Sequence, residues 1–180
     1  MKLAVISGAW CTGKTNMANK LFEMLGWPVF ALDFYKEKRF DRGETGRLNE
    51  ESYDDLFKDL DDVLQKDQSC IVESDFTDER QVQRLIDVGQ KVNADFVQVY
   101  LFADNKILLQ RFIDRLESGE RHSGHGDEQY LQKAKDELES GNDFVVIFAP
   151  LEFPGSLIKI DTSDFDQVDY DSIVERINTK

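Results

Sequence analysis

The chain has 180 residues, a length that suits one compact domain with a single core. Hydrophobic residues make up 41% of it, including thirteen Phe, which argues against wholesale disorder. Lys and Arg number 22 against 36 Asp and Glu, so the formal net charge is −14. An acidic surface repels phosphate backbones and anionic lipids, so we expect no stable binding to nucleic acid or membrane, although a local pocket can still hold a small anion.

The chain carries no sign of export or membrane insertion. Cys11 and Cys70 are too few for a disulfide framework, and both fall in or just after predicted strands, so we expect free thiols in a reducing compartment. No stretch approaches the ~20 apolar residues that cross a bilayer. The first residues are too short a run for a secretory signal. We therefore expect a cytoplasmic protein.

Short apolar runs alternate along the chain with segments whose apolar residues recur at helical spacing. In chain order we predict a strand at 3–6, a helix at 14–25, a strand at 29–32, a helix at 52–65, a strand at 71–72, a helix at 77–92 capped by Thr77, a strand at 96–102, helices at 107–116 and 127–138, a strand at 157–160 and a helix at 170–177. This alternation predicts an α/β domain with a mainly parallel sheet and right-handed crossovers.

Three segments do not fit that alternation. Residues 36–51 are highly charged and aperiodic, and we predict a mobile surface excursion there. Residues 119–126 are broken by glycines and are predicted to form a loop. The apolar run at 144–148 could belong to either kind of element, so no type is assigned to it.

The segment from Gly8 to Thr15 matches the phosphate-loop pattern G-x-x-x-x-G-K-[ST] between a buried strand and an amphipathic helix. Gly8 and Gly13 permit backbone angles that turn successive N–H groups toward one anion, and the following helix adds its positive end. Lys14 can place its charge between the β- and γ-phosphates, and the Thr15 hydroxyl can ligate Mg²⁺. The residues predicted to hold a nucleoside triphosphate are Gly8, Ala9, Trp10, Cys11, Thr12, Gly13, Lys14 and Thr15.

The alternative to this motif is a glycine turn that matches it by chance. Two of its residues also have open roles. The inward N–H groups could make Cys11 a redox sensor, or the residue simply fills the loop. Trp10 could cover a bound substrate or pack against the protein.

Two acidic residues follow predicted strands at the edge where open α/β sheets bind ligands. Asp33, after the second strand, could accept the proton of a hydroxyl nucleophile or hold that hydroxyl in line; the alternative is an ordinary turn cap. Glu73 closes the third strand and could be a Mg²⁺ or water ligand, or a substrate contact; the alternative is a charge facing solvent.

A basic cluster stands out in this acidic chain, and it comprises Arg111, Arg115, Arg121 and His122. Arg111 and Arg115 share a helix face, where like charges repel unless an anion lies between them, and a triphosphate supplies such an anion. Guanidinium groups can also neutralise the charge of a transferring phosphoryl group. The alternative is ordinary surface pairing with neighbouring acids.

Both histidines of the chain, His122 and His125, lie in the glycine-broken loop. A zinc site needs three or four ligands on a firm frame, and both cysteines are remote in sequence. A lid loop that orders on nucleotide binding is therefore the favoured interpretation.

Taken together, these residues resemble the small P-loop kinases, a family that includes shikimate, gluconate and nucleoside kinases and chloramphenicol phosphotransferase. The resemblance rests on the phosphate loop, Asp33, Glu73, the pattern Leu108-x-x-Arg111-x-x-x-Arg115 followed by Gly-Glu-Arg-His, and the closing Ile160-Asp161-Thr162-Ser163. It implies a three-layer α/β/α fold with a five-stranded parallel sheet of order 2-3-1-4-5. It also implies one domain over 1–180, with a substrate-covering segment at 36–51 and a lid at 111–126.

The same resemblance implies roles for individual residues. Asp33 would be the base that activates a hydroxyl, Arg111 and Arg115 would be lid arginines, and the loop around Thr162 would lie at the edge of the adenine. Further candidate substrate contacts are Tyr35, Glu73 and Arg121. The run Asp33-Phe34-Tyr35-Lys36 is similar to the Asp-x-Phe-Tyr of uridine kinases but is one residue shorter, so the acceptor's identity does not carry over.

The sequence thus predicts an ATP- and Mg²⁺-dependent kinase that phosphorylates a hydroxyl of a small molecule, as a monomer or homodimer. One alternative is a GTP-driven switch, but Asn105-Lys106-Ile107-Leu108 lacks the Asp of a guanine-binding motif, and the chain has no Asp-x-x-Gly. The other is a kinase of a polynucleotide end or of a large cofactor; the net charge disfavours a long polyanion. Basic residues at 36–47 either indicate an acidic or phosphorylated acceptor or balance neighbouring acids.

Overall fold

A computed structural model describes residues 1–44, 48–119, 122–125, 127–140 and 150–179. The strands are β1 (Lys2–Gly8), β2 (Val29–Ala31), β3 (Cys70–Glu73), β4 (Asp95–Phe102) and β5 (Ser156–Asp161). The helices are α1 (Lys14–Leu25), α2 (Leu32–Asp41), α3 (Leu48–Leu64), α4 (Glu79–Lys91), α5 (Asn105–Glu117), α6 (Leu131–Ser140) and α7 (Tyr170–Asn178). Short 3₁₀ helices are η1 (Ser123–His125), η2 (Asp127–Tyr130) and η3 (Phe165–Gln167).

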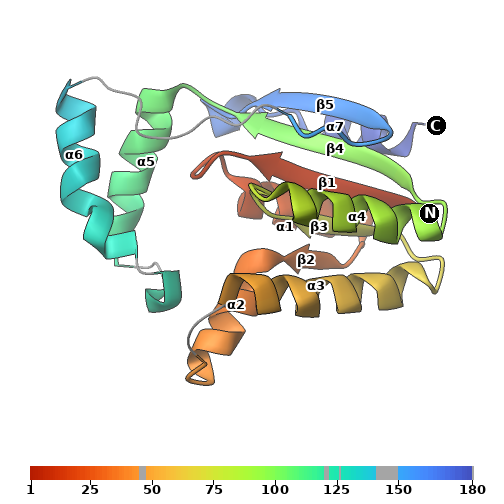
Figure 1. The fold of residues 1–180 in the computed structure, drawn as a ribbon. Helices are drawn as coiled ribbons and strands as arrows, with labels where there is room; N and C mark the ends of the chain where they lie inside the picture. The colour runs from red at the N-terminus through yellow and green to blue at the C-terminus, as the bar shows by residue number, and fades with distance from the viewer. Residues whose placement is uncertain (45–47, 120–121, 126, 141–149, 180) are drawn as a thin grey trace.

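The five strands form one sheet of order β2-β3-β1-β4-β5, and every neighbouring pair is parallel. The predicted fold class and strand order are therefore confirmed. Helices lie on both sides of the sheet, as Figure 1 shows, which gives three layers. Because all strands run the same way, their carboxyl ends meet at one edge, which is where α/β sheets bind ligands.

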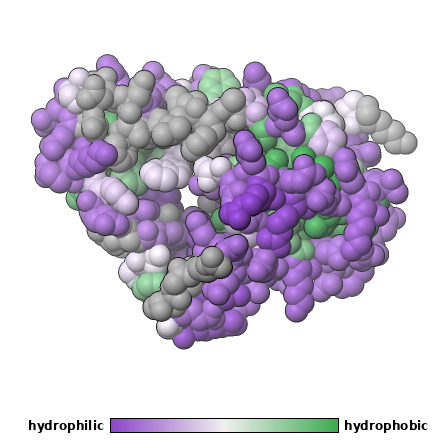
Figure 2. Space-filling model, in the orientation of Figure 1, coloured by the Kyte–Doolittle hydropathy of each residue, from purple (hydrophilic) through white to green (hydrophobic). Residues whose placement is uncertain are grey.

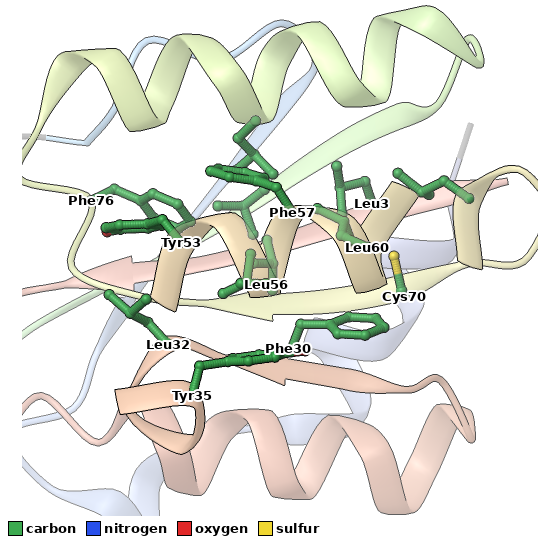
Figure 3. Packing of buried hydrophobic residues seen from close by; sticks show 14 of the residues in the cluster. Leu3, Phe30, Leu32, Tyr35, Tyr53, Leu56, Phe57, Leu60, Cys70 and Phe76 are labelled. Atoms are coloured by element: carbon green, nitrogen blue, oxygen red, sulfur yellow. The ribbon is translucent and has the colours of Figure 1, made fainter. Parts of the chain in front are cut away.

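The central strand β1 is buried on both faces, which explains its uninterrupted apolar sequence. Leu3 and Val5 pack on the face covered by α3 and α4, whereas Ala4 and Ile6 pack on the face covered by α1 and α7. All four side chains have no exposed surface. Figure 3 shows the first of these cores, where side chains of α3 meet those of the sheet and of α2.

Helices α5 and α6 pack against each other beside the carboxyl ends of β1 and β4 (Figure 1). Leu109, Phe112 and Ile113 of α5 bury their apolar face together with Ala134 of α6. This satellite core is separate from the two cores of the sheet, and Cys11 of the phosphate loop packs both against it and against a small cluster of Ala9, Ala103 and Leu108. The α5–α6 pair therefore forms one wall of any binding site at this edge of the sheet.

The largest departure from prediction is α2. The described part of the segment 36–51 is not an aperiodic excursion, because residues 36–41 belong to α2 and residues 48–51 to α3. The helical period was hidden because α2 buries only Leu32 and Tyr35. Arg39 helps to hold it in place by pairing with three carboxylates, including Asp55 of α3 at 2.7 Å.

Smaller corrections concern helix starts. Asp78, not Thr77, caps α4, and its side chain accepts a hydrogen bond from the Arg80 amide. The predicted helix 127–138 is a 3₁₀ turn followed by α6, and the predicted loop 119–126 contains η1. The unassigned run 144–148 lies outside the described residues. Within the described part of the chain, no helix combines the length and apolar character needed to cross a membrane.

Candidate active site

The loop between β1 and α1 has the backbone of an anion cradle. Cys11 and Gly13 both adopt left-handed conformations, with φ of 60° and 86°, and such residues form concavities lined by N–H groups. Gly8 has a φ of 146°, and a Cβ there would lie 2.3 Å from the carbonyl oxygen of Leu101. A Cβ on Gly13 would lie 2.5 Å from the ring of Phe165. Both fixed glycines of the motif are therefore required by space as well as by conformation.

Two side chains of the loop bind the loop itself. The Lys14 ammonium donates to the carbonyl oxygens of Gly8 and Ala9, each at 3.1 Å. The buried Thr12 hydroxyl donates to the Ala9 carbonyl at 2.8 Å. Thr12 therefore closes the loop from inside, while Lys14 holds its charge across the mouth of the cradle.

A cavity of about 600 Å³ opens at this edge of the sheet, and Figure 2 shows a hollow in the viewed face between the side of α5–α6 and the side of α2–α3. It brings together nine of the predicted site residues: Trp10, Cys11, Gly13, Lys14, Thr15, Asp33, Glu73, Arg111 and Arg115. It has further lining residues that the sequence analysis did not single out for the site, among them Lys36, Asn49, Asp75, Phe112, Asp127 and Phe165. The cavity thus joins the phosphate loop to acidic and basic groups from four other elements.

Glu73 lies at the floor of this cavity, next to the phosphate loop. Its side chain is 6% exposed, which excludes the alternative of a solvent-facing strand end. The Thr15 hydroxyl donates to Glu73 Oε2 at 3.5 Å. Burial raises the pKa of Glu73 above its ordinary value, and nearby Asp33 and Asp75 add to this, while Lys14 and the Thr15 hydroxyl oppose it. Such a buried carboxylate gains from a cation at the site.

These groups fit a magnesium ion better than a metal held by protein alone. Within the described residues, no group of three or more His, Cys, Asp and Glu side chains is arranged to hold a metal. Mg²⁺ usually takes one or two protein oxygens and completes its shell with phosphate and water. The adjacent oxygens of Thr15 and Glu73 are the kind of donors that this arrangement needs.

Strand β2 ends at Ala31, one residue earlier than predicted, and α2 begins at Leu32. Asp33 therefore lies in the first turn of α2, and it lines the cavity from there. The N-terminal end of a helix carries partial positive charge, which interacts favourably with a carboxylate at this position. Lys36 Nζ lies 3.8 Å from Asp33 Oδ1 on the same helix. The side chain is 42% exposed, so it remains accessible to a small molecule in the cavity.

Arg111 is tied to the loop that follows β5. Its Nη2 donates to the carbonyl oxygens of Thr162 and Ser163, at 2.8 and 3.1 Å, and its guanidinium lies 4.2 Å from the ring centre of Phe165. Burial lowers the pKa of this guanidinium. Its Nη1 is buried without a hydrogen-bond partner in the described part of the chain. Arg115 lines the same cavity one helical turn further along.

Two predicted residues outside the phosphate loop, Tyr35 and Thr162, do not line the cavity. Tyr35 points into the core beside Phe30 (Figure 3), and its hydroxyl donates to Asp59 at 3.0 Å. The Thr162 hydroxyl is buried and donates to the carbonyl of Phe102 at 3.1 Å, so Phe165, not Thr162, presents a side chain to the cavity from this loop. Arg121 lies outside the described residues.

The two histidines do not share a metal site in the structure. His122 faces Asp41 and His125 faces Glu37, with the ring centres 6.2 Å apart. Both partners belong to α2, so the loop that carries the histidines contacts that helix. Trp10 stacks on Phe112 with 6.2 Å between ring centres, as the packing alternative predicts, and it also lines the cavity.

The geometry of the loop and cavity agrees with what comparison with known proteins finds. The family model described as "AAA domain" matches residues 3–140. The chain belongs to the AAA domain family. A search of the curated proteins finds no match.

Solved structures add to this family assignment. A proposed kinase from Chloroflexus aurantiacus j-10-fl is similar at 26% identity and a TM-score of 0.84, covering 98% of this chain and 96% of its own. The fold is also that of the Mycobacterium tuberculosis APS kinase in complex with AMPPNP and APS, at 12% identity, TM-score 0.58, and 98% and 94% coverage. A gluconokinase from Sinorhizobium meliloti 1021 shares it at 14% identity, TM-score 0.54, and 98% and 89% coverage. This AAA domain therefore has the fold of the small P-loop kinases.

The sequence analysis missed several residues that line the cavity of this AAA domain. Phe165 has no motif around it, and it reaches the cavity because η3 packs against Gly13. Asp75 lies two residues after Glu73, so a second acidic residue near the strand end was a signal that could have been used. Asn49 carried no signal, because it lies in a segment predicted to be aperiodic.

Proposed function

We propose that this protein is an ATP-dependent kinase that transfers a γ-phosphoryl group to a hydroxyl of a small molecule, with Mg²⁺ as cofactor. Residues 1–180 would act as one domain, in the cytoplasm, with 111–126 as the lid over the nucleotide. The observation that carries the proposal is the shared cavity, which the phosphate loop and the carboxylate of Asp33 both line. A nucleotide-binding module without transfer would not need this additional acidic group.

The donor side is formed by the phosphate loop. The backbone N–H groups between Gly8 and Thr15 would bind the phosphate oxygens, and Lys14 would exchange its contacts with the loop carbonyls for contacts with the β- and γ-phosphates. Thr15 and Glu73 would hold Mg²⁺, which supplies positive charge against the phosphate oxygens when it is bound. The buried Glu73 would stay close to the ion because it has little access to water.

The acceptor side is formed by α2. Asp33 would accept a hydrogen bond from the acceptor hydroxyl, orient it toward the phosphoryl group and take its proton as the new bond forms. Lys36 lies beside it, with Nζ 3.8 Å from Asp33 Oδ1, and would pair with the carboxylate. The 42% exposure of the Asp33 side chain, at the cavity that it lines, suits contact with a polar acceptor.

The two arginines would divide the remaining work. Arg111 is held by two carbonyls and by the Phe165 ring, so it would serve as a fixed wall beside the nucleotide, with the donors of Nη1 available to it. Arg115 would place its charge near the transferring phosphoryl group. A guanidinium suits this role because it remains charged and can bind two oxygens at once.

A screen for acceptor-dependent release of ADP tests this function. The protein is incubated with Mg·ATP and a panel of nucleosides, sugars, hydroxy acids and hydroxyl-bearing antibiotics, and products are identified by ³¹P NMR. We expect release that depends on one acceptor class and on Mg²⁺, with ATP preferred over GTP. Binding of Mg·ATP by calorimetry without any acceptor-dependent product would instead support a regulatory module.

A further inference from the structure

The loop that carries the two histidines, residues 122–125, packs directly on α2. His122 Nε2 lies 3.1 Å from Asp41 Oδ1, and its ring meets Phe40 edge-on at 5.6 Å. Gly124 packs against the Phe40 ring, and a Cβ added to Gly124 would lie 2.8 Å from Phe40 Cγ. We call residues 122–125 the lid loop, and this contact joins it to the helix that carries the proposed base.

His125 makes the deeper of the two histidine contacts. Its Nε2 lies 2.8 Å from Glu37 Oε1, and its Nδ1 lies 4.0 Å from Asp33 Oδ1. The His125 side chain is 6% exposed, against 29% for His122. Because Glu37 accepts only, Nε2 carries the proton in that hydrogen bond. The imidazole therefore lies between two carboxylates and within the wall of the cavity.

The spacing on α2 explains why this ring fits there. Asp33 and Glu37 are four residues apart, so their carboxylates lie on one face of the helix and repel each other. The His125 ring occupies the space between them, with Nε2 at 2.8 Å from Glu37 and Nδ1 at 4.0 Å from Asp33, and therefore limits the rotation of both side chains. Lys36 flanks Asp33, while Asp127 and Arg115 line the same cavity, so His125 is part of a larger charged network.

We propose that His125 is a positioning residue that locks the lid loop onto α2 and orients the Asp33 carboxylate toward the acceptor hydroxyl. This inference rests on the proposed function, because the orientation of Asp33 matters only if a hydroxyl is presented to it. It links two parts of the site that are distant in sequence. The acceptor side is then complete only when the lid loop is docked on α2.

The contact itself can be tested without knowing the acceptor. The untagged chain has two histidines, so ring ¹H–¹³C NMR spectra contain two sets of signals, assigned with His122→Gln and His125→Gln. We expect Asp33→Asn and Glu37→Gln each to shift the His125 signals and leave the His122 signals in place. Asp41→Asn should do the reverse. His125 signals that respond to neither Asp33→Asn nor Glu37→Gln overturn the proposal.

The positioning role is tested by kinetics with an acceptor found in the screen. We expect His125→Ala to lower kcat about 10- to 100-fold and to leave the calorimetric Kd for Mg·ATP within about threefold, since misplacing a group that contacts the reacting atoms costs about that much. His125→Asn, whose amide can occupy the place of Nδ1, should recover part of the loss. His122→Gln, in the same loop but without a contact to Asp33, should lose clearly less activity than His125→Ala. An unchanged kcat for His125→Ala, or an equal loss for His122→Gln, overturns the positioning role.

The two experiments separate this inference from the proposed function. If the unsubstituted protein transfers no phosphate to any acceptor but the NMR shifts follow the expected pattern, the kinase function fails and the locked lid loop remains. If the protein is an active kinase and the His125 signals do not shift in Asp33→Asn or Glu37→Gln, the kinase function remains and the inference about His125 fails.

Discussion

The phosphate loop and the acceptor wall differ in how they are built. The loop is one continuous segment whose backbone angles, glycines and Lys14 form the site almost by themselves. The proposed acceptor wall combines Asp33 of α2 with His125 of the lid loop, which are far apart in the sequence. A site made from local backbone geometry can serve many reactions, whereas a wall assembled from distant side chains can change its substrate by small changes in packing.

This difference predicts which substitutions act on the donor and which act on the acceptor. The largest effect is expected for Lys14→Met, which should lower kcat/KM about 10³-fold, since a charge aimed at the transferring group is lost. Coupled ADP release and calorimetry measure transfer and nucleotide affinity, and both should fall. The matched control is Lys20→Met on the same helix, where Lys20 is exposed and pairs with Glu23 at 2.8 Å. Equal activities of the two variants would contradict the donor assignment.

The next largest effect is expected for Asp33→Asn. It should lower kcat about 10²-fold because an amide cannot take the proton of the acceptor hydroxyl. Nucleotide affinity should change little, since α2 does not form the phosphate loop. Asp41→Asn, two turns along the same helix and with a 67% exposed side chain, is the control and should keep nearly full activity. A parallel loss of Mg·ATP binding in Asp33→Asn would remove the distinction between donor and acceptor sides.

A third substitution tests whether the phosphate loop requires glycine at position 8. Gly8→Ala should destabilise the fold by about 2 kcal/mol or more, because the new Cβ would lie 2.3 Å from the Leu101 carbonyl and the backbone is in a strained region for Ala. Gly26→Ala has a positive φ of 69° but no atom within 4 Å of the new Cβ, so about 1 kcal/mol is expected there. Urea unfolding measures both values. Similar losses of stability in the two variants would show that the close approach of Gly8 to Leu101 does not constrain the loop.

The smallest expected effect is a pH-dependent change in thermal stability on substitution of Glu73. Burial raises the pKa of Glu73 above its ordinary value of 4.5, so the folded state binds this proton more tightly than the unfolded state. The stabilisation from the bound proton is present below pH 4.5 and is lost as pH rises through the raised value. Glu73→Gln should therefore gain thermal stability relative to the unsubstituted protein as pH rises toward neutrality, in buffer with EDTA. A difference in Tm that stays constant across this range would contradict the burial argument.

Much of the fold could be predicted from the sequence because its elements are marked by local patterns. The run of Leu3 to Ile6 is apolar at every position, as a strand covered on both faces must be, and the phosphate loop has fixed residues at fixed spacing. Helix α2 could not be predicted, since most of its residues face water or carboxylates and only Leu32 and Tyr35 are buried. Arg39 stabilises it through partners such as Asp55, sixteen residues away.

The same physical limit applies to the site. By itself the sequence determined the nucleotide cradle, because turning N–H groups toward an anion depends on residues that are neighbours in the chain. Only the tertiary structure decided that Phe165 rather than Thr162 faces the cavity and that Tyr35 belongs to the core. Only it brought His125 between Glu37 and Asp33, across 88 and 92 residues of chain. Contacts of that range depend on how α2, α5 and the sheet pack, and no local pattern records the result.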